Sequence, residues 1–407
     1  MEHIDFKIYG YRWVVLVAFM FVISINQLLW ITFAPITSSA ATFYGVSDLS
    51  IGLLSMCFMI VYIVVSIPAS WVIDKYGIKV AVGMGVTLTG IFGLLRGLLS
   101  DNYTLVLIAQ IGIAIGQPFI LNAITTVSAR WFPINERATA AGLGSLAMYI
   151  GIATGLALTP YLTIQSQISG MLLIYGIVSV IAVAVFFLFV KERPPTSPCL
   201  PGQEERSLVF DGLKKSLRMK DFILLLVIFF VGLGVFNAVT TWIEDIVRPR
   251  GFSIVQAGNI GGLMILGGII GAVVVPLLSD HYRKRTPFLL MAVVGATIGL
   301  VGITFTTSYW FLLVSAFVFG FFLLSAGPVG FQYGAEVTYP TPEGTSNGLL
   351  LLMGQISGVA FILGMDSFKD VETGSMTTPL TVLIGLMVLS LLLATKLKDT
   401  KTFMGTD

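Results

Sequence analysis

Amide and indole side chains interrupt several long apolar stretches of this chain. Asn26, Gln27 and Trp30 lie in one stretch, and Gln117 and Asn122 lie in another. Asn26 and Trp30 are four residues apart, so in a helix they share a face. Amides both donate and accept hydrogen bonds, whereas the face of an indole attracts cations. The chemistry expected of this set is the noncovalent binding of a small neutral or cationic solute.

Later apolar stretches carry a second set of the same residue types. It comprises Asn237, Thr240, Thr241, Trp242, Gln332, Tyr333 and Gln355. Polar side chains are costly in hydrocarbon unless they face protein or water. Each one therefore either lines a substrate path or joins neighbouring helices by hydrogen bonds, and Trp30 could instead anchor at the membrane interface. Asn122 and Gln332 fit the two interpretations equally well.

Ionisable residues are absent from the middles of these stretches. Arg96, Glu244, Asp245 and Glu336 all lie close to predicted ends. Proton-coupled carriers need a titratable group within the membrane, so the pattern favours facilitated diffusion down the solute's own gradient. It also disfavours a strongly anionic substrate, because no buried Arg or Lys is expected.

The sequence contains no pattern that indicates a catalytic, metal-binding or cofactor-binding site. Cys57 and Cys199 are too far apart in the expected topology for a disulfide, and His3 and His281 are isolated. No phosphate-binding glycine loop is present, so ATP is not expected to drive the protein. We predict a protein that is not an enzyme, without metal or cofactor.

The elements that must position these residues are membrane-spanning helices. The chain is 56% hydrophobic and 11% charged, with a mean hydropathy of +0.94, which excludes an ordinary soluble domain. A helix needs about 20 apolar residues to cross the hydrocarbon. Twelve such runs are predicted near 11–34, 50–73, 79–99, 103–128, 137–160, 169–190, 221–247, 254–279, 287–306, 309–334, 345–366 and 377–396.

The two halves of the chain repeat each other. Pro133 and Pro340 are 207 residues apart, and so are Glu136 and Glu343; the prolines Pro118 and Pro328 are 210 apart. Parallel repeats of six spans are typical of transporters whose halves enclose a path. We predict two bundles, 1–190 and 221–407, joined by a proline-rich linker, 191–220, whose part from 207 to 218 could lie on the membrane surface as an amphipathic helix.

Basic residues set the orientation. The side that carries both termini holds 19 of the 23 Lys and Arg residues, which predicts cytoplasmic termini under the positive-inside rule. The net charge of +2 gives no reason to expect nucleic-acid binding. The expected partners are the lipid bilayer of the cell membrane and a small-molecule substrate.

Short loops carry the next pattern. Asp74, Lys75 and Gly77 lie between the second and third spans, and Asp280 and Arg283 lie at the equivalent place in the second half. Gly77 can supply a positive φ, and Asp74 can cap the following helix. The pattern resembles the loop signature of the major facilitator superfamily, which implies that fold and, by analogy, a monomer. The resemblance implies gating contacts, with Asp74 pairing with Arg137; stop-transfer and capping roles are the alternative. We include Glu336 and Glu343 among these residues.

A narrower resemblance rests on two segments. Residues 43–57 and 335–350, the latter containing Ala335-Glu336-Val337-Thr338-Tyr339-Pro340, are similar to the feline leukaemia virus subgroup C receptor-related transporters. That family implies uniport-like movement of choline, ethanolamine or haem. Its choline-binding positions match Trp30, Gln117, Asn237 and Gln355 here.

The chain departs from that family at Asn237, where the family has a tyrosine. Losing one aromatic wall is expected to weaken binding of a quaternary ammonium and to favour a substrate with hydrogen-bonding groups. Because spans one, four, seven and ten line the cavity in the superfamily, we add Asn26, Tyr333 and Trp242 to the candidate substrate-binding residues.

The sequence thus predicts an all-α alternating-access uniporter of a choline-like amine or related metabolite. One alternative is a proton-coupled exporter of lipophilic compounds, in which Glu244, Asp245 or Glu336 reaches the cavity. Another is a membrane receptor that binds a ligand without moving it.

Overall fold

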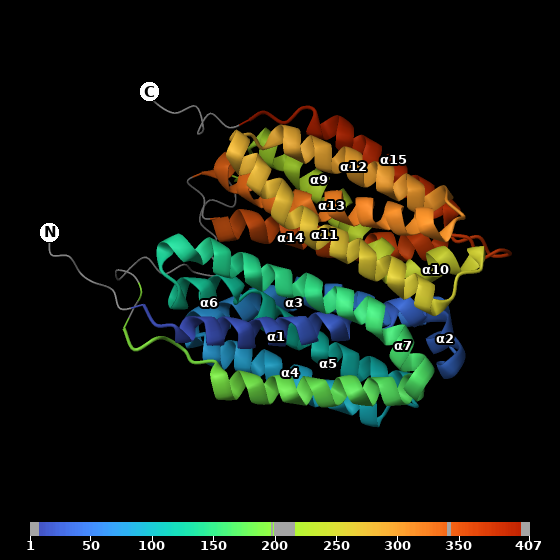
Figure 1. The fold of residues 1–407 in the computed structure, drawn as a ribbon, viewed down its shortest axis with the longest axis horizontal. Coiled ribbons are helices and arrows are strands. Elements are labelled where there is room, and N and C mark those ends of the chain that lie inside the picture. Colours follow the sequence, from blue (N-terminus) through green and yellow to red (C-terminus); the bar gives the residue numbers. More distant parts are fainter. Residues whose placement is uncertain (1–7, 197, 199–215, 340–342, 400–407) are drawn as a thin grey trace. The chain divides into compact units, whose positions relative to one another are not determined.

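The computed structural model describes residues 8–196, 198, 216–339 and 343–399, with the side chains of residues 134, 135 and 343–345 left out (Figure 1). The predicted linker therefore lies largely outside the described residues. Every regular element in the described part is helical. Among the described residues, eleven helices are long and apolar enough to cross a membrane.

The first half of the chain begins with a broken helix. Helix α1 (Tyr11–Ile31) is followed by the 3₁₀ turn η1 (Ala34–Ile36) and the short α2 (Thr37–Tyr44). The proline of η1 occupies its first turn, where a missing N–H is tolerated. Helices α3 (Asp48–Tyr76), α4 (Ile78–Leu98), α5 (Tyr103–Leu121), α6 (Ile124–Trp131) and α7 (Ile134–Phe189) follow.

Helix α7 contains two of the twelve predicted spans. It bends at Gln167, whose φ of 61° and ψ of 175° are not helical. That backbone region is strained for any residue other than glycine. The predicted spans 137–160 and 169–190 lie on either side of this residue, which reconciles twelve predicted spans with eleven long helices.

The second half repeats the broken helix. Helix α9 (Lys220–Thr241) ends at Trp242 and is followed by α10 (Ile243–Val247) and the 3₁₀ turn η2 (Arg248–Arg250). Helices α11 (Ile254–Tyr282), α12 (Thr286–Phe305), α13 (Tyr309–Thr338), α14 (Glu343–Ser367) and α15 (Thr377–Ala394) complete it. The ends of α1 and α9, at Ile31 and Thr241, are 210 residues apart, which is the repeat offset of Pro118 and Pro328.

The chain divides into two compact units. The first comprises 1–30, 61–155 and 162–208; the second comprises 31–60, 156–161 and 209–407. The boundary at Trp30 and Ile31 falls where α1 ends. Segment 31–60, which belongs to the first sequence repeat, is therefore packed with the second repeat. The predicted bundles 1–190 and 221–407 describe the bodies expected to move in transport, and they stay a prediction.

Within each unit, small residues allow close helix packing. In the first unit, a Cβ atom on Gly116 of α5 would lie 2.5 Å from the carbonyl oxygen of Gly85 on α4. In the second unit, α11 and α12 pack on α13, and α9 packs on α14 (Figure 1). Close backbone approach is the usual way in which helices associate in lipid, where van der Waals packing replaces the hydrophobic effect.

Candidate functional site

Trp30 and Gln117 both belong to the first unit and both are nearly buried, each being 6% exposed. Trp30 lies one residue before the end of α1. The preceding carbonyl, of Leu29, accepts hydrogen bonds from Arg96 Nη1 at 3.0 Å and from Gln110 Nε2 at 3.2 Å. Gln110 and Gln117 are two turns apart on α5, so they lie on one face of that helix. The end of α1 is thus held by α4 and α5.

Arg96 corrects one expectation from the sequence. It lies in the last turn of α4 and is 0% exposed. The expectation that the spans contain no buried Arg or Lys is therefore wrong. Arg96 Nη1 also donates to Gln110 Oε1 at 2.7 Å. The two oxygen acceptors on Nη1, from Leu29 and Gln110, offset part of the cost of burying this charge. The burial of Arg96 was missed because the end of a span was taken to be exposed, whereas it can be buried in protein.

Asn237 and Gln355 both belong to the second unit. Asn237 Nδ2 donates to the carbonyl oxygen of Gly354 at 3.1 Å, and Gln355 is the next residue of α14. A Cβ atom on Gly358, one turn further, would lie 2.8 Å from Asn237 Nδ2. The amide that replaces the family's tyrosine therefore packs directly on α14, beside the half-buried Gln355.

Other predicted binding residues have structural contacts. The Asn26 amide donates to Thr89 Oγ1 at 3.2 Å and accepts from Gln27. Trp242 is fully buried, and its Nε1 donates to the carbonyl of Ile362 at 3.1 Å. Tyr333 is fully buried, and its hydroxyl donates to the carbonyl of Lys398 at 2.9 Å. These contacts match the helix-joining interpretation of polar residues in spans, and they give no support to substrate contact.

The two residues that the sequence left open also contact neighbouring residues. Asn122 accepts from the Tyr62 hydroxyl at 2.6 Å and donates to Ser66 and Ser70, all on α3. Gln332 Nε2 donates to Glu336 Oε1 at 3.1 Å within α13. Asn122 therefore joins the end of α5 to α3, whereas the Gln332 bond stays within one helix.

The loop between α3 and α4 forms the tight turn that was predicted. Gly77 has φ 88° and ψ 177°, so the positive φ is confirmed. The cap is different: the N–H groups of Ile78 and Lys79 donate to Glu192, at 3.1 and 2.6 Å, and Arg130 pairs with the same carboxylate. Glu192 takes the capping role that the sequence assigned to Asp74. Lys75 stacks on Trp71, with Nζ 4.5 Å from the ring centroid.

The second half repeats this cap at the same offset. The N–H groups of Arg285 and Thr286 donate to Asp399 at 3.1 and 2.9 Å. Asp399 lies 207 residues after Glu192, and Arg285 lies 207 after Ile78. The sequence contained this signal, because the offset was already known from Pro133 and Pro340, but the capping residue lies too far along the chain to be paired by inspection.

The predicted gating residues of the second half meet around a different arginine. Arg285 is 4% exposed; its Nε pairs with Glu336 at 3.1 Å and its Nη1 pairs with Asp280. Arg283 is exposed and has a positive φ of 51° directly after α11, as Gly77 has a positive φ directly after α3. Arg285, which was not among the predicted gating residues, thus contacts two of them, Asp280 and Glu336.

Some predicted gating contacts are left as predictions. Arg137 Nε donates to the carbonyl of Phe132 at 3.3 Å, and its pairing with Asp74 stays a prediction. Glu136 instead forms a two-point pair with Arg12, at 3.0 and 3.2 Å. The side chain of Glu343 lies outside the described residues.

We expect Gly77→Ala to destabilise the protein by about 2–4 kcal/mol, because its backbone region is open only to glycine and an added Cβ would displace the Glu192 cap. The Cβ would lie 2.2 Å from Glu192 Oε1. Gly45→Ala is the matched control: Gly45 also has a positive φ, of 66°, but no atom lies within 4 Å of the added Cβ. Thermal unfolding in detergent should show the smaller loss, about 1 kcal/mol, for Gly45→Ala; equal losses would exclude the cap as the cause.

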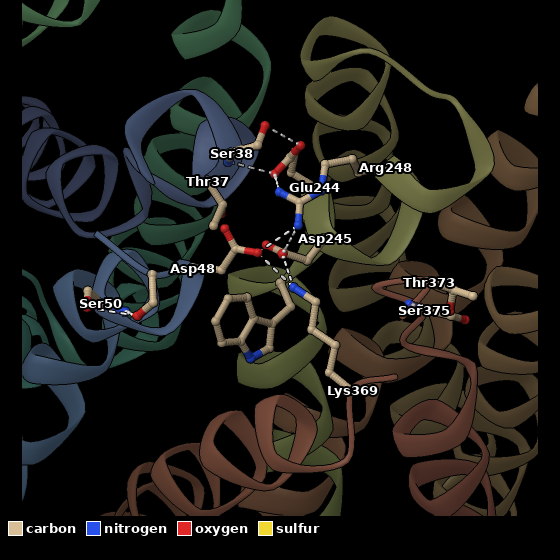
Figure 2. A network of polar contacts seen from close by, with 12 residues as sticks. Thr37, Ser38, Asp48, Ser50, Glu244, Asp245, Arg248, Lys369, Thr373 and Ser375 are labelled. Atoms are coloured by element: carbon tan, nitrogen blue, oxygen red, sulfur yellow. Dashed lines mark hydrogen bonds and ion pairs between the residues drawn. The ribbon is translucent and has the colours of Figure 1, made fainter. Parts of the chain in front are cut away.

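A second cluster, which we call the α10 ion network, lies in the second unit and comprises Ser38, Asp48, Glu244, Asp245, Arg248 and Lys369 (Figure 2). Asp48 Oδ2 accepts from Arg248 Nη2 at 2.7 Å and from Lys369 Nζ at 2.8 Å. Asp245 Oδ1 accepts from the same two cations, each at 2.9 Å. The two cations are thus shared by carboxylates from both sequence repeats.

Glu244 joins the network to α2. Its Oε1 accepts from the Ser38 hydroxyl at 2.8 Å, and its Oε2 accepts from the Ser38 N–H at 3.0 Å and from Arg248 at 3.3 Å. Trp242 packs against α3, where a Cβ atom on Gly52 would lie 2.7 Å from the indole ring. These contacts fix segment 31–60 to α10 and the end of α14.

Burial dominates the electrostatics of α10, which lies beyond the apolar span Lys220–Thr241. Burial raises the pKa of Asp245 to about 7, against the opposing effect of Lys369. Burial likewise raises the pKa of Glu244, against Arg248 and the Ser38 hydrogen bonds. The pKa of Lys369 is also raised, because Asp245 and Asp48 outweigh its desolvation. The sequence marked Glu244 and Asp245 only as end residues; their partners, 206 and 124 residues away, were missed.

A fold of two repeated helical groups with broken first and seventh spans defines a class of membrane carrier. The sequence profile described as the Major Facilitator Superfamily matches residues 15–362. The chain belongs to this family, and it is a multi-pass membrane transporter rather than an enzyme.

Named relatives narrow the similarity. Solute carrier family 49 member A3 of Xenopus tropicalis is 31% identical over 377 residues, covering 88% of this chain and 78% of that protein. The human choline/ethanolamine transporter FLVCR2 is 27% identical over 385 residues, covering 89% and 73%. An uncharacterized MFS-type transporter of Caenorhabditis elegans is 30% identical over 383 residues, and the chain spans 64% of its length. The resemblance to the receptor-related transporters is therefore confirmed.

Solved structures agree on the fold. A bacterial homologue of the human lysosomal transporter Spinster, inward-facing and occupied, has a TM-score of 0.71 at 15% identity, covering 96% of this chain and 98% of that one. The unoccupied form has a TM-score of 0.67 at 17% identity, covering 96% of each chain. The predicted major facilitator fold is confirmed.

Proposed function

We propose that the protein is an alternating-access uniporter of a small neutral or cationic organic solute, such as a choline-like amine. Relatives named as choline/ethanolamine transporters supply the substrate class. We further propose a monomer in the cell membrane with both termini in the cytoplasm, as the asymmetry of basic residues predicts.

The observation that carries this proposal is the pair of helix breaks. Helix α1 ends one residue after Trp30, and α9 ends four residues after Asn237, at the repeat offset of 210 residues. Discontinuous helices in corresponding positions of two repeats are a general marker of transporter substrate sites. We propose that Trp30, Gln117, Asn237 and Gln355 bind the substrate, with Trp30 supplying the aromatic face for a cation.

The remaining candidates have a different proposed role. Asn26 and Trp242 support the breaks, because each is bonded to a neighbouring helix. Tyr333 has a structural role near Arg285. Its hydroxyl donates to the carbonyl of Lys398, the residue before the Asp399 that caps α12 at Arg285. This division leaves three amides, Gln117, Asn237 and Gln355, and one indole, Trp30, as the proposed substrate-binding residues.

Coupling is tested by uptake into proteoliposomes. Radiolabelled choline and ethanolamine should equilibrate down their own gradients, to an extent that an imposed pH gradient does not change. Uphill accumulation driven only by that gradient would replace uniport with the proton-coupled alternative.

A further inference from the structure

The α10 ion network has more acid than base. Three carboxylates, Asp48, Glu244 and Asp245, share two cations, Arg248 and Lys369. A fourth carboxylate, Asp366 on α14, interacts with the charges of Lys369 and Asp48. It adds to the excess of negative over positive charge. Uncompensated negative charge in a buried cluster is costly, and taking up one proton relieves it.

The carboxylates differ in how fully they are bonded. Both oxygens of Glu244 accept hydrogen bonds, and Asp48 is 25% exposed to solvent. Asp245 is 0% exposed; Oδ1 accepts from both cations, whereas Oδ2 is buried with no hydrogen-bond partner within the described part of the chain. Of the atoms in the network, Asp245 Oδ2 is therefore the one placed to carry a proton.

We propose that Asp245 is a proton-binding site that controls the release of segment 31–60 from α10 and α14. The proposal rests on alternating access, because the first repeat has to separate from the second when the transporter changes state. Segment 31–60 is then pulled away from α10, and the ion network is broken. Protonation neutralises Asp245 while Arg248 and Lys369 remain paired with Asp48 and Glu244.

The direction of the pH effect follows from linkage. We call the arrangement with segment 31–60 bound to α10 the closed form, and the separated arrangement the open form. In the closed form, burial raises the pKa of Asp245. In the open form the carboxyl is exposed to water, so its pKa returns toward the ordinary value. The closed arrangement then binds the proton more tightly, so lowering the pH favours it. Between about pH 8 and about pH 6 the ratio of closed to open forms should rise about tenfold.

Distance measurements between two spin labels test this without any substrate. The labels are placed by Phe43→Cys on α2 and Val371→Cys after α14, both exposed positions, in a chain whose Cys57 and Cys199 are replaced by Ala. In lipid nanodiscs, a long-distance population should shrink as the pH is lowered. Asp245→Asn, which mimics the protonated carboxyl, should hold the short distance at every pH.

Asp101→Asn is the matched control, because Asp101 lies in the other unit and should keep the response of the parent chain. Infrared difference spectra over the same pH range should contain a protonated-carboxyl band that Asp245→Asn removes. A distance distribution that does not change with pH, or a band that survives Asp245→Asn, overturns the proposal. Neither result bears on choline uptake, so failure here is distinguishable from failure of the proposed function.

Discussion

Arg248→Met is expected to open the α10 ion network at neutral pH. Arg248 binds Asp48, Asp245 and Glu244. Its loss leaves Lys369 as the remaining cation on Asp48 and Asp245, and leaves Glu244 with its Ser38 hydrogen bonds. Removing one partner of a buried ion pair costs about 3–5 kcal/mol, and we expect about 3 because Arg248 is 30% exposed. The closed arrangement should become about a hundredfold less favoured. Distances between labels on Phe43→Cys and Val371→Cys measure the change.

Two companion variants separate charge balance from general damage. Arg250→Met removes a cation two residues away that binds the carbonyls of Ile303, Thr304 and Thr306 instead, so it should leave the label distance unchanged. Asp245→Asn added to Arg248→Met should restore part of the closed population, because it removes the orphaned buried charge. No restoration, or an equal effect of Arg250→Met, would mean that the network does not hold the segment.

Trp30→Ala is expected to weaken binding of a choline-like cation by about tenfold, because an indole face contributes about 0.5–2 kcal/mol to such a site. Trp30→Phe keeps an aromatic face and should lose only a few-fold. Ligand-induced thermal stabilisation of the purified protein with choline measures both. Trp13→Ala is the control, since Trp13 lies near the start of α1 and is 40% exposed. Unchanged stabilisation in Trp30→Ala would remove Trp30 from the site.

The fold could be predicted almost completely from the sequence, because apolar length and an internal repeat are local or periodic signals. The positive φ at Gly77 also followed, since only glycine suits that turn. What the sequence did not show is long-range pairing. Glu192 caps a helix 113 residues before it, and Lys369 pairs with Asp48 across 321 residues. Such contacts leave no periodic trace in one chain.

The substrate-binding residues stay a prediction. Residue types alone indicated the amides and Trp30 as candidates. They could not distinguish an amide that binds substrate from one that joins helices, as Asn26 and Asn122 do. Arg96 was misjudged because position near a helix end was taken as exposure. The helix breaks beside Trp30 and Asn237 were missed because the apolar runs 11–34 and 221–247 continue through them.

The most direct test of the central claim is substrate counterflow. Proteoliposomes loaded with unlabelled choline, at equal pH inside and outside, should transiently concentrate external labelled choline, and Trp30→Ala should reduce that uptake about tenfold at subsaturating choline. Counterflow equal in the parent chain and in Trp30→Ala, or choline binding without any counterflow, would contradict a choline-like uniporter with its site at Trp30.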